Sequence, residues 1–207
     1  MKTTFLPTFN GLPINTNPSM GWGCYVDILD GIYNQLVNLQ SYDSRIQVIR
    51  FDIRLPNKKR YDVKEENRQL RSFFKGIKEN LALKRWGSHK RVIHGWVREV
   101  GTTNHAHYHV FMSFRRFALH LGAFSRDGNT GLWDLIDRCS KRIPGANLRY
   151  SKVIHNLERG DTEAFEKCFY HLSYLAKLRD KELRAGTRHK LYDISRLKIK
   201  ETAILAA

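Results

Sequence analysis

The spacing of apolar residues divides the chain into two kinds of segment. Apolar residues three or four positions apart are typical of a helix with one buried face, whereas apolar residues at every second position are typical of a strand. The first pattern predicts four helices, over residues 26–39, 64–84, 131–143 and 161–183. In the second of these helices, the side chains expected in the core are Leu70, Phe73, Phe74, Ile77 and Leu81.

The alternating pattern predicts four strands, over residues 45–55, 91–100, 105–114 and 147–157. The first strand has one buried face and ends at Pro56. Its apolar side chains point one way and its charged ones the other; the apolar set is Ile49, Phe51, Ile53 and Leu55, and the charged set is Arg50, Asp52 and Arg54. The second and third strands form a hairpin around the turn GTTN, and the fourth is a candidate edge strand.

The order of the predicted elements is helix, strand, helix, hairpin, helix, strand, helix. This order indicates a fold of the α+β class, with a central antiparallel sheet and flanking helices. A length of 207 residues suits a single domain. We expect an N-terminal arm and helix over residues 1–44, the main body over 45–195 and a C-terminal tail over 196–207.

The charge of the chain limits the classes of binding partner that we expect. The net charge is +16, with a pI near 10.0, and such a surface is typical of a protein that binds a polyanion. Nucleic acid is favoured over a membrane, because no apolar run approaches the roughly 20 residues that span a bilayer. The N-terminus also lacks the apolar core of a signal peptide. Three cysteines without paired spacing favour a reducing compartment, so the cytoplasm is the expected location.

The stretch NHAHYHVFM (104–112) carries three histidines at alternate positions just before an apolar run. Two successive histidines on one strand face lie about 6.5 Å apart, so their imidazoles can reach one ion. The first and third lie about 13 Å apart, which is too far to share it. We expect His107 and His109 to form the pair, because His105 lies near the turn; a role for His105 stays open.

A third ligand is expected from the partner strand of the hairpin. Glu99 lies a few residues before the turn, so closure of the hairpin brings it close to His107. Two imidazoles and a carboxylate leave coordination positions open, as a catalytic site requires. Mg²⁺ or Mn²⁺ suits this set when a phosphate oxygen completes the shell. The alternative is that these side chains are polar residues on a solvated strand face.

Four polar side chains share one narrow sector of the helix predicted over residues 161–183. At about 100° per residue, Tyr170, Tyr174, Lys177 and Lys181 form one stripe, and the opposite face is apolar. A phenol is a poor nucleophile at its ordinary pKa of about 10, but a nearby lysine or metal favours the phenolate. Its attack on a phosphodiester would form a phosphotyrosine. The alternative is that both tyrosines are half-buried and both lysines only solvate the helix.

Three segments stand in order along the chain: IRFDIRLP (49–56), HYH (107–109) and YLAK (174–177). Together they resemble the three motifs of HUH endonucleases, which include rolling-circle replication initiators and relaxases. With HGWVREV (94–100) and GTRHKLYDIS (186–195), the chain is similar to the inovirus-type gene II replication initiation proteins of phages and prophages. The resemblance covers about residues 45–195. It implies a sheet of about five strands, with the histidine pair on a central strand and the tyrosine helix beside it.

The resemblance also implies a role for each matched residue. His107 and His109 match the metal-binding pair, and Glu99 stands where such initiators often supply a carboxylate ligand. Tyr174 matches the nucleophile of the Tyr-x-x-Lys motif, and Lys177 matches its lysine.

Two further positions are less closely matched. Tyr170 resembles the second tyrosine of the branch in which two nucleophiles alternate. The first motif departs from its common threonine-containing form, because Asp52 and Arg54 stand on its polar face. Asp52 either supports the metal or pairs with a neighbouring arginine.

The function implied is that of a rolling-circle replication initiator. Such a protein nicks one strand of single-stranded or locally melted origin DNA, keeps the 5′ phosphate on Tyr174 and frees a 3′ hydroxyl. A helicase and a polymerase of the bacterial host would follow. The residues expected to contact DNA are Arg50, Arg54, Lys58, Lys59, Arg60, Lys181, Arg188 and Lys190. The alternatives are a relaxase or transposase of the same class, a metal-dependent hydrolase that uses water, and a DNA-binding regulator without catalysis.

Overall fold

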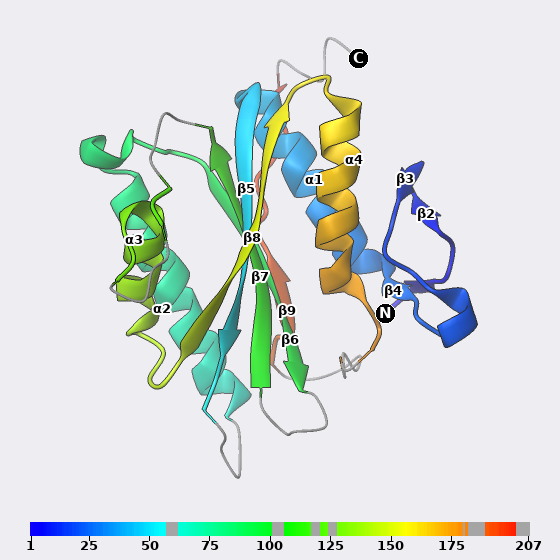
Figure 1. Ribbon diagram of the computed structural model, residues 1–207, viewed down its shortest axis with the longest axis horizontal. Coiled ribbons are helices and arrows are strands. Elements are labelled where there is room, and N and C mark those ends of the chain that lie inside the picture. The colour runs from blue at the N-terminus through cyan, green and yellow to red at the C-terminus, as the bar shows by residue number, and fades with distance from the viewer. Residues whose placement is uncertain are drawn as a thin grey trace.

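A five-stranded antiparallel sheet runs through the centre of the computed structural model (Figure 1). The structure describes residues 1–56, 62–100, 106–116, 121–123, 128–179, 181 and 189–201. In spatial order the strands are β8 (Asn147–Glu158), β5 (Arg45–Arg54), β7 (Ala106–Arg115), β6 (Val92–Val100) and β9 (Tyr192–Ile194). The predicted hairpin is confirmed as β6 and β7, and the predicted edge strand is confirmed as β8.

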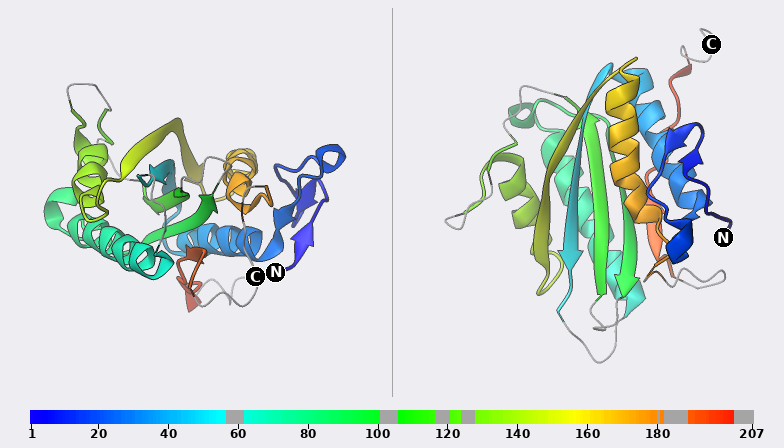
Figure 2. Two further views of the ribbon diagram at one scale, coloured as in Figure 1. Left: turned by 90° about the horizontal axis from the view of Figure 1, so that it is seen from below. Right: turned by 45° about the vertical axis from the view of Figure 1, so that its right-hand side comes forward.

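Two helices cover each face of the sheet, so the α+β domain has three layers (Figures 1 and 2). Helices α2 (Val63–Leu81) and α3 (Gly131–Ser140) pack on one face, and α1 (Val26–Tyr42) and α4 (Thr162–Ser173) pack on the other. The first turn of α2 is capped by the Asp62 carboxylate, which accepts from the backbone N–H groups of Lys64 and Glu65. All five core side chains expected on α2 are buried.

Strand β5 is buried on both faces, so the expectation of a single buried face was wrong. The predicted apolar set faces α2 and α3: Ile49, Phe51, Ile53 and Leu55. On the other face, Ile46 and Val48 in the first half of the strand pack against α1 and α4. Arg50 and Asp52 follow on the same face in the second half of the strand. A register shift in the β5–β8 pairing falls between Ile49 and Phe51. The polar half of this face lies toward the end of the sheet where β6 ends and β7 begins.

Helix α4 is shorter than the pattern predicted. It ends at Ser173, continues as one 3₁₀ turn, η3 (Tyr174–Ala176), and leaves the helix at Lys177, whose ψ is 138°. The Leu178 N–H donates to the Gly23 carbonyl oxygen at 2.9 Å, so an extended pairing replaces the next helical turn. Tertiary pairing has therefore overridden the helical propensity of the segment.

The first 25 residues, which begin the N-terminal arm and helix expected over residues 1–44, contain short paired strands. These are β1 (Thr3–Thr4) with β4 (Cys24–Tyr25), and β2 (Thr8–Phe9) with β3 (Leu12–Pro13), followed along the chain by a 3₁₀ turn, η1 (Pro18–Met20). We call residues 1–25 the N-terminal arm. It packs beside the C-terminal end of α4 (Figure 1), and α1 shares a core with β5 and α4. Residues on both sides of the boundary expected at residue 44 therefore belong to the same hydrophobic core.

Five of the predicted functional residues lie outside the part of the chain that the structure describes: Lys58, Lys59, Arg60, His105 and Arg188. Among the helices that are described, none combines the length and the apolar content needed to cross a bilayer.

Candidate active site

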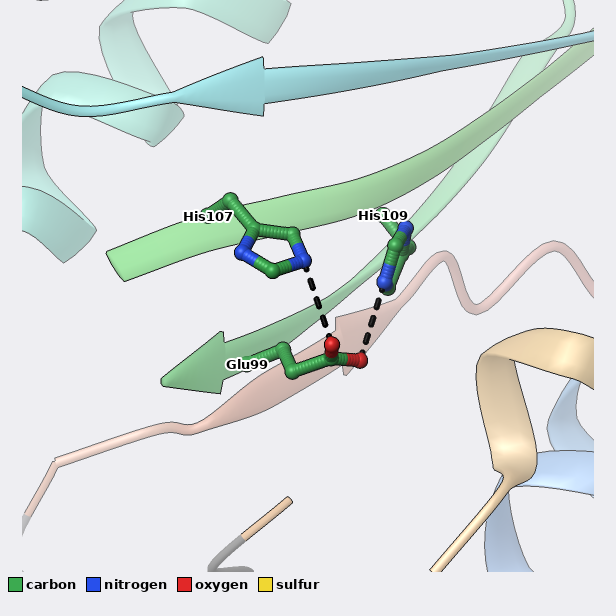
Figure 3. A group of neighbouring side chains, drawn as sticks. All are labelled: Glu99, His107 and His109. Atoms are coloured by element: carbon green, nitrogen blue, oxygen red, sulfur yellow. Dashed lines mark hydrogen bonds and ion pairs between the residues drawn. The ribbon is translucent and has the colours of Figure 1, made fainter. Parts of the chain in front are cut away.

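The hairpin brings Glu99, His107 and His109 together at the end of the sheet where β6 ends and β7 begins. Glu99 lies directly opposite His107 in the β6–β7 register, as predicted, and His109 follows on the same face of β7. In Figure 3 both imidazoles converge on the Glu99 carboxylate. His107 Nε2 lies 3.2 Å from Oε1 and His109 Nε2 lies 3.0 Å from Oε2. Ligand atoms of all three residues lie within 4.8 Å of one another.

The donor set suits a divalent cation. Metal–ligand distances of about 2.0–2.2 Å place adjacent ligand atoms about 3 Å apart, which is close to the two imidazole–carboxylate distances of 3.2 and 3.0 Å. Two imidazoles and one carboxylate leave positions open for water or substrate. His107, His109 and Glu99 could therefore hold a metal ion, and its identity as Mg²⁺ or Mn²⁺ stays a prediction.

Asp52 orients one of the two imidazoles. It lies opposite His109 in the β5–β7 register, and its Oδ1 is 2.7 Å from His109 Nδ1. Burial alone would raise the pKa of Asp52, but the hydrogen bond and charge of His109, and then Arg50, hold it below its ordinary value. A carboxylate that accepts from Nδ1 fixes the ring and leaves Nε2 available to a metal. The contact of Asp52 with His109 favours the supporting role of the two that the sequence left open.

We expect Asp52→Asn to lower the affinity of the protein for Mn²⁺ by about 10- to 100-fold, the usual cost of losing an outer-shell partner. The amide keeps the shape of the side chain but removes the charge that favours the required tautomer of His109. Isothermal titration with Mn²⁺ measures the change. Asp137→Asn, at an exposed position on α3, is the matched control. An unchanged affinity in Asp52→Asn would contradict the orienting role.

Lys181 lies beside the same carboxylate. Its Nζ is 3.0 Å from Glu99 Oε2, and its side chain is only 1% exposed. Burial lowers the pKa of Lys181 more than Glu99 raises it. The sequence predicted a surface contact to DNA for this lysine; the structure instead places it in a buried ion pair. The reason is that the chain leaves the helix at Lys177, so Lys181 no longer follows the stripe expected from helical spacing.

Tyr174 stands beside the cluster, at the first residue of η3. Its ring centroid lies 5.2 Å from that of His109, with the rings perpendicular, and Arg50 Cζ lies 4.5 Å from the tyrosine ring. Lys177 Nζ lies 5.0 Å from the same ring. Burial, followed by the negative charge of Glu99, raises the pKa of the phenol. The structure therefore brings the hairpin cluster and the predicted nucleophile into one site.

The other predicted residues lie elsewhere. Tyr170 is 45% exposed, and within the described part of the chain no contact joins it to the cluster. Arg54 is exposed at the end of β5. Lys190 forms an ion pair of 2.7 Å with Asp193 on β9. Of the predicted stripe of two tyrosines and two lysines, Tyr170 is therefore separate. The other three members do lie together, because Lys177 Nζ and Lys181 Nζ lie 5.0 and 5.4 Å from the Tyr174 ring.

On the opposite face of the sheet, buried polar side chains connect the hairpin to α2. The Tyr108 hydroxyl donates to the Glu66 carboxylate, and Arg98 Nε lies 2.9 Å from the same oxygen. Glu66 belongs to α2, so one carboxylate joins that helix to both strands of the hairpin. Glu66 lies one turn before Leu70 on the buried face of α2. Helical spacing places it on that face but does not show which side chains of the sheet it meets.

The comparisons with known proteins place the chain in a family. A model of the YagK/YfjJ C-terminal domain matches residues 7–189. No curated protein and no solved structure matches the chain. The matched range begins within the N-terminal arm and includes every residue of the site from Asp52 to Lys181, and it covers well over half of the 207 residues. The chain therefore belongs to the YagK/YfjJ C-terminal domain family.

Proposed function

We propose that the protein is a metal-dependent, HUH-type endonuclease that nicks single-stranded DNA through Tyr174 and initiates rolling-circle replication. The observation that carries the proposal is the contact of the Tyr174 ring with His109, one of three side chains able to hold a divalent cation. A tyrosine beside such a cluster, in a chain of net charge +16, suits transfer of a nucleic-acid phosphate. The sheet order, with the histidine pair on a central strand, agrees with the resemblance to replication initiators.

The hairpin residues would supply the metal-binding half of the site. His107, His109 and Glu99 are the ligands, and Asp52 holds the ring of His109 in place. A bound cation would polarise a phosphoryl oxygen and offset the carboxylate charge that raises the pKa of Tyr174. Lys181, now paired with Glu99, would provide a compensating positive charge at the same carboxylate.

Tyr174 would supply the nucleophile. Its phenolic oxygen forms a bond to phosphorus while the bond from phosphorus to the 3′ oxygen breaks, which leaves a 5′-phosphotyrosine. The proton lost by the phenol is balanced by the proton that the departing 3′ oxygen gains. Arg50 and Lys177 lie against the tyrosine ring, where their charges favour the phenolate and attract the phosphate.

In this proposal the protein acts on origin DNA in the cytoplasm of a bacterial host, and the freed 3′ hydroxyl primes synthesis by a host polymerase. Opening of the duplex beyond the nick requires a host helicase. A DNA-binding regulator that has lost catalysis is the competing function, and the same experiment separates the two.

The experiment is incubation of the purified protein with a labelled single-stranded oligonucleotide of the origin region and Mg²⁺ or Mn²⁺. We expect a covalent protein–DNA species on a denaturing gel, and peptide mapping should locate the modification at Tyr174. DNA cleavage without a covalent species would favour hydrolysis by water. Binding without either product would favour the regulator and contradict the proposal.

A further inference from the structure

A row of alternating cations and aromatic rings extends from the site onto the N-terminal arm. Its members, in spatial order, are Arg50, Tyr174, Lys177, Trp22 and Arg179, and we call them the cation–aromatic row. Lys177 Nζ lies 5.0 Å from the Tyr174 ring on one side and 5.1 Å from the Trp22 ring on the other. Arg179 Cζ lies 5.4 Å from the Trp22 ring. Trp22 is partly exposed.

The position of Trp22 is set by main-chain bonds rather than by the row itself. Trp22 exchanges backbone hydrogen bonds of 2.8 and 2.9 Å with Asn17 across the η1 turn. The following residues pair with the chain that leaves the tyrosine: Cys24 bridges to Lys177, and the Leu178 N–H donates to Gly23. The arm therefore holds an indole ring next to the candidate nucleophile.

The row also concentrates positive charge. Arg50, Lys177 and Arg179 gather around two rings, whereas the nearby Lys181 is already paired with Glu99. Burial lowers the pKa of Lys177, and the charges of Arg179 and Arg50 lower it further. A phosphate placed among these groups would relieve this repulsion. Aromatic rings that alternate with cations are what single-stranded nucleic acid requires, because bases stack on the rings and phosphates pair with the cations.

We propose that Trp22 stacks on a base of single-stranded DNA, one step along the strand from the phosphate presented to Tyr174. This inference rests on the proposed function and adds the N-terminal arm to the substrate site. Lys177 would contact the phosphate between the two rings, and Arg179 would contact the next phosphate. The arm would thereby fix which nucleotide lies at the point of cleavage.

The test compares two oligonucleotides of equal length, one of thymidines and one of abasic residues, by fluorescence anisotropy. Loss of one stacking contact costs about 1–3 kcal/mol, so Trp22→Ala should weaken binding of the thymidine oligonucleotide about five- to 150-fold. Binding of the abasic oligonucleotide, which keeps the phosphates and lacks bases, should be almost unchanged. Trp86→Ala is the matched control, because Trp86 is equally half-buried and lies in η2 (Lys84–Trp86), before the opposite end of β6.

A second measurement separates stacking from a purely structural role for the indole. Thymidine oligonucleotide should quench the tryptophan fluorescence of the wild-type protein, and Trp22→Phe should lose most of the quenching while it keeps its affinity within a few fold. Equal losses for both oligonucleotides, or quenching that survives in Trp22→Phe, would overturn the assignment of Trp22. Failure of the wild-type protein to bind single-stranded DNA at all would instead overturn the proposed function, and this inference with it.

Discussion

Replacement of Tyr174 with phenylalanine is expected to abolish the covalent protein–DNA species. The variant keeps the ring that contacts His109, Arg50 and Lys177 and loses only the oxygen that would attack phosphorus. Removal of a nucleophile lowers the rate of its reaction by roughly 10⁴-fold or more, so no adduct should accumulate. The measurement is a denaturing gel of the protein with labelled oligonucleotide and Mn²⁺.

Tyr170→Phe is the matched control for this experiment. Tyr170 lies one turn earlier on α4, is exposed and is not brought to the cluster. We expect this variant to form the adduct at a normal rate. Full activity of Tyr174→Phe would contradict the proposed nucleophile, and loss of the adduct in Tyr170→Phe would favour the two-tyrosine chemistry that the sequence suggested.

Replacement of His109 with alanine is expected to lower the affinity for Mn²⁺ by at least about 100-fold, which is more than loss of an outer-shell partner costs. His109 is the most connected side chain of the cluster, since it contacts both Asp52 and Glu99 and is almost completely buried. Its removal deletes one ligand and leaves two carboxylates without the ring between them. Isothermal titration, or the electron paramagnetic resonance signal of free Mn²⁺, measures the change.

His155→Ala is the control for a histidine outside the cluster. His155 lies on the edge strand β8 and contacts His171 of α4, with 3.0 Å between the ring nitrogens. Its loss should leave Mn²⁺ binding unchanged. If His109→Ala binds Mn²⁺ as tightly as this control, the Glu99–His107–His109 group is not a metal site.

The sequence carried most of the information about the elements. Alternation in RIQVIRFDIRLP and in HAHYHVFMSF identified two adjacent central strands, β5 and β7, and helical spacing identified all four helices. Periodicity could not show that β5 is covered on both faces, because Ile46 and Val48 precede the polar half of the same face. It also could not locate the end of α4, since a hydrogen bond to Gly23, more than 150 residues away, decides where the helix stops.

The site was predictable wherever two residues share a strand or a hairpin. The spacing of His107 and His109, and the turn that sets Glu99 opposite His107, are local features. Contacts with sequence-distant partners were not predictable in the same way. Asp52 reaches His109 only through the β5–β7 register, and Lys181 reaches Glu99 only because the chain leaves the helix at Lys177. Trp22 gave no signal at all, since a lone tryptophan in an arm rich in Pro and Asn has no pattern to interpret.

The separation of the site residues along the chain has a consequence for biosynthesis. Asp52, the hairpin that carries Glu99 and His109, and Tyr174 come from three separate parts of the chain, and they meet only through long-range contacts of the hairpin with β5 and η3. Such contacts form late, because the loops between them must close first. A nascent or partly unfolded chain therefore holds the candidate ligands and the tyrosine apart, and we expect the proposed reactivity toward nucleic acid only in the folded protein.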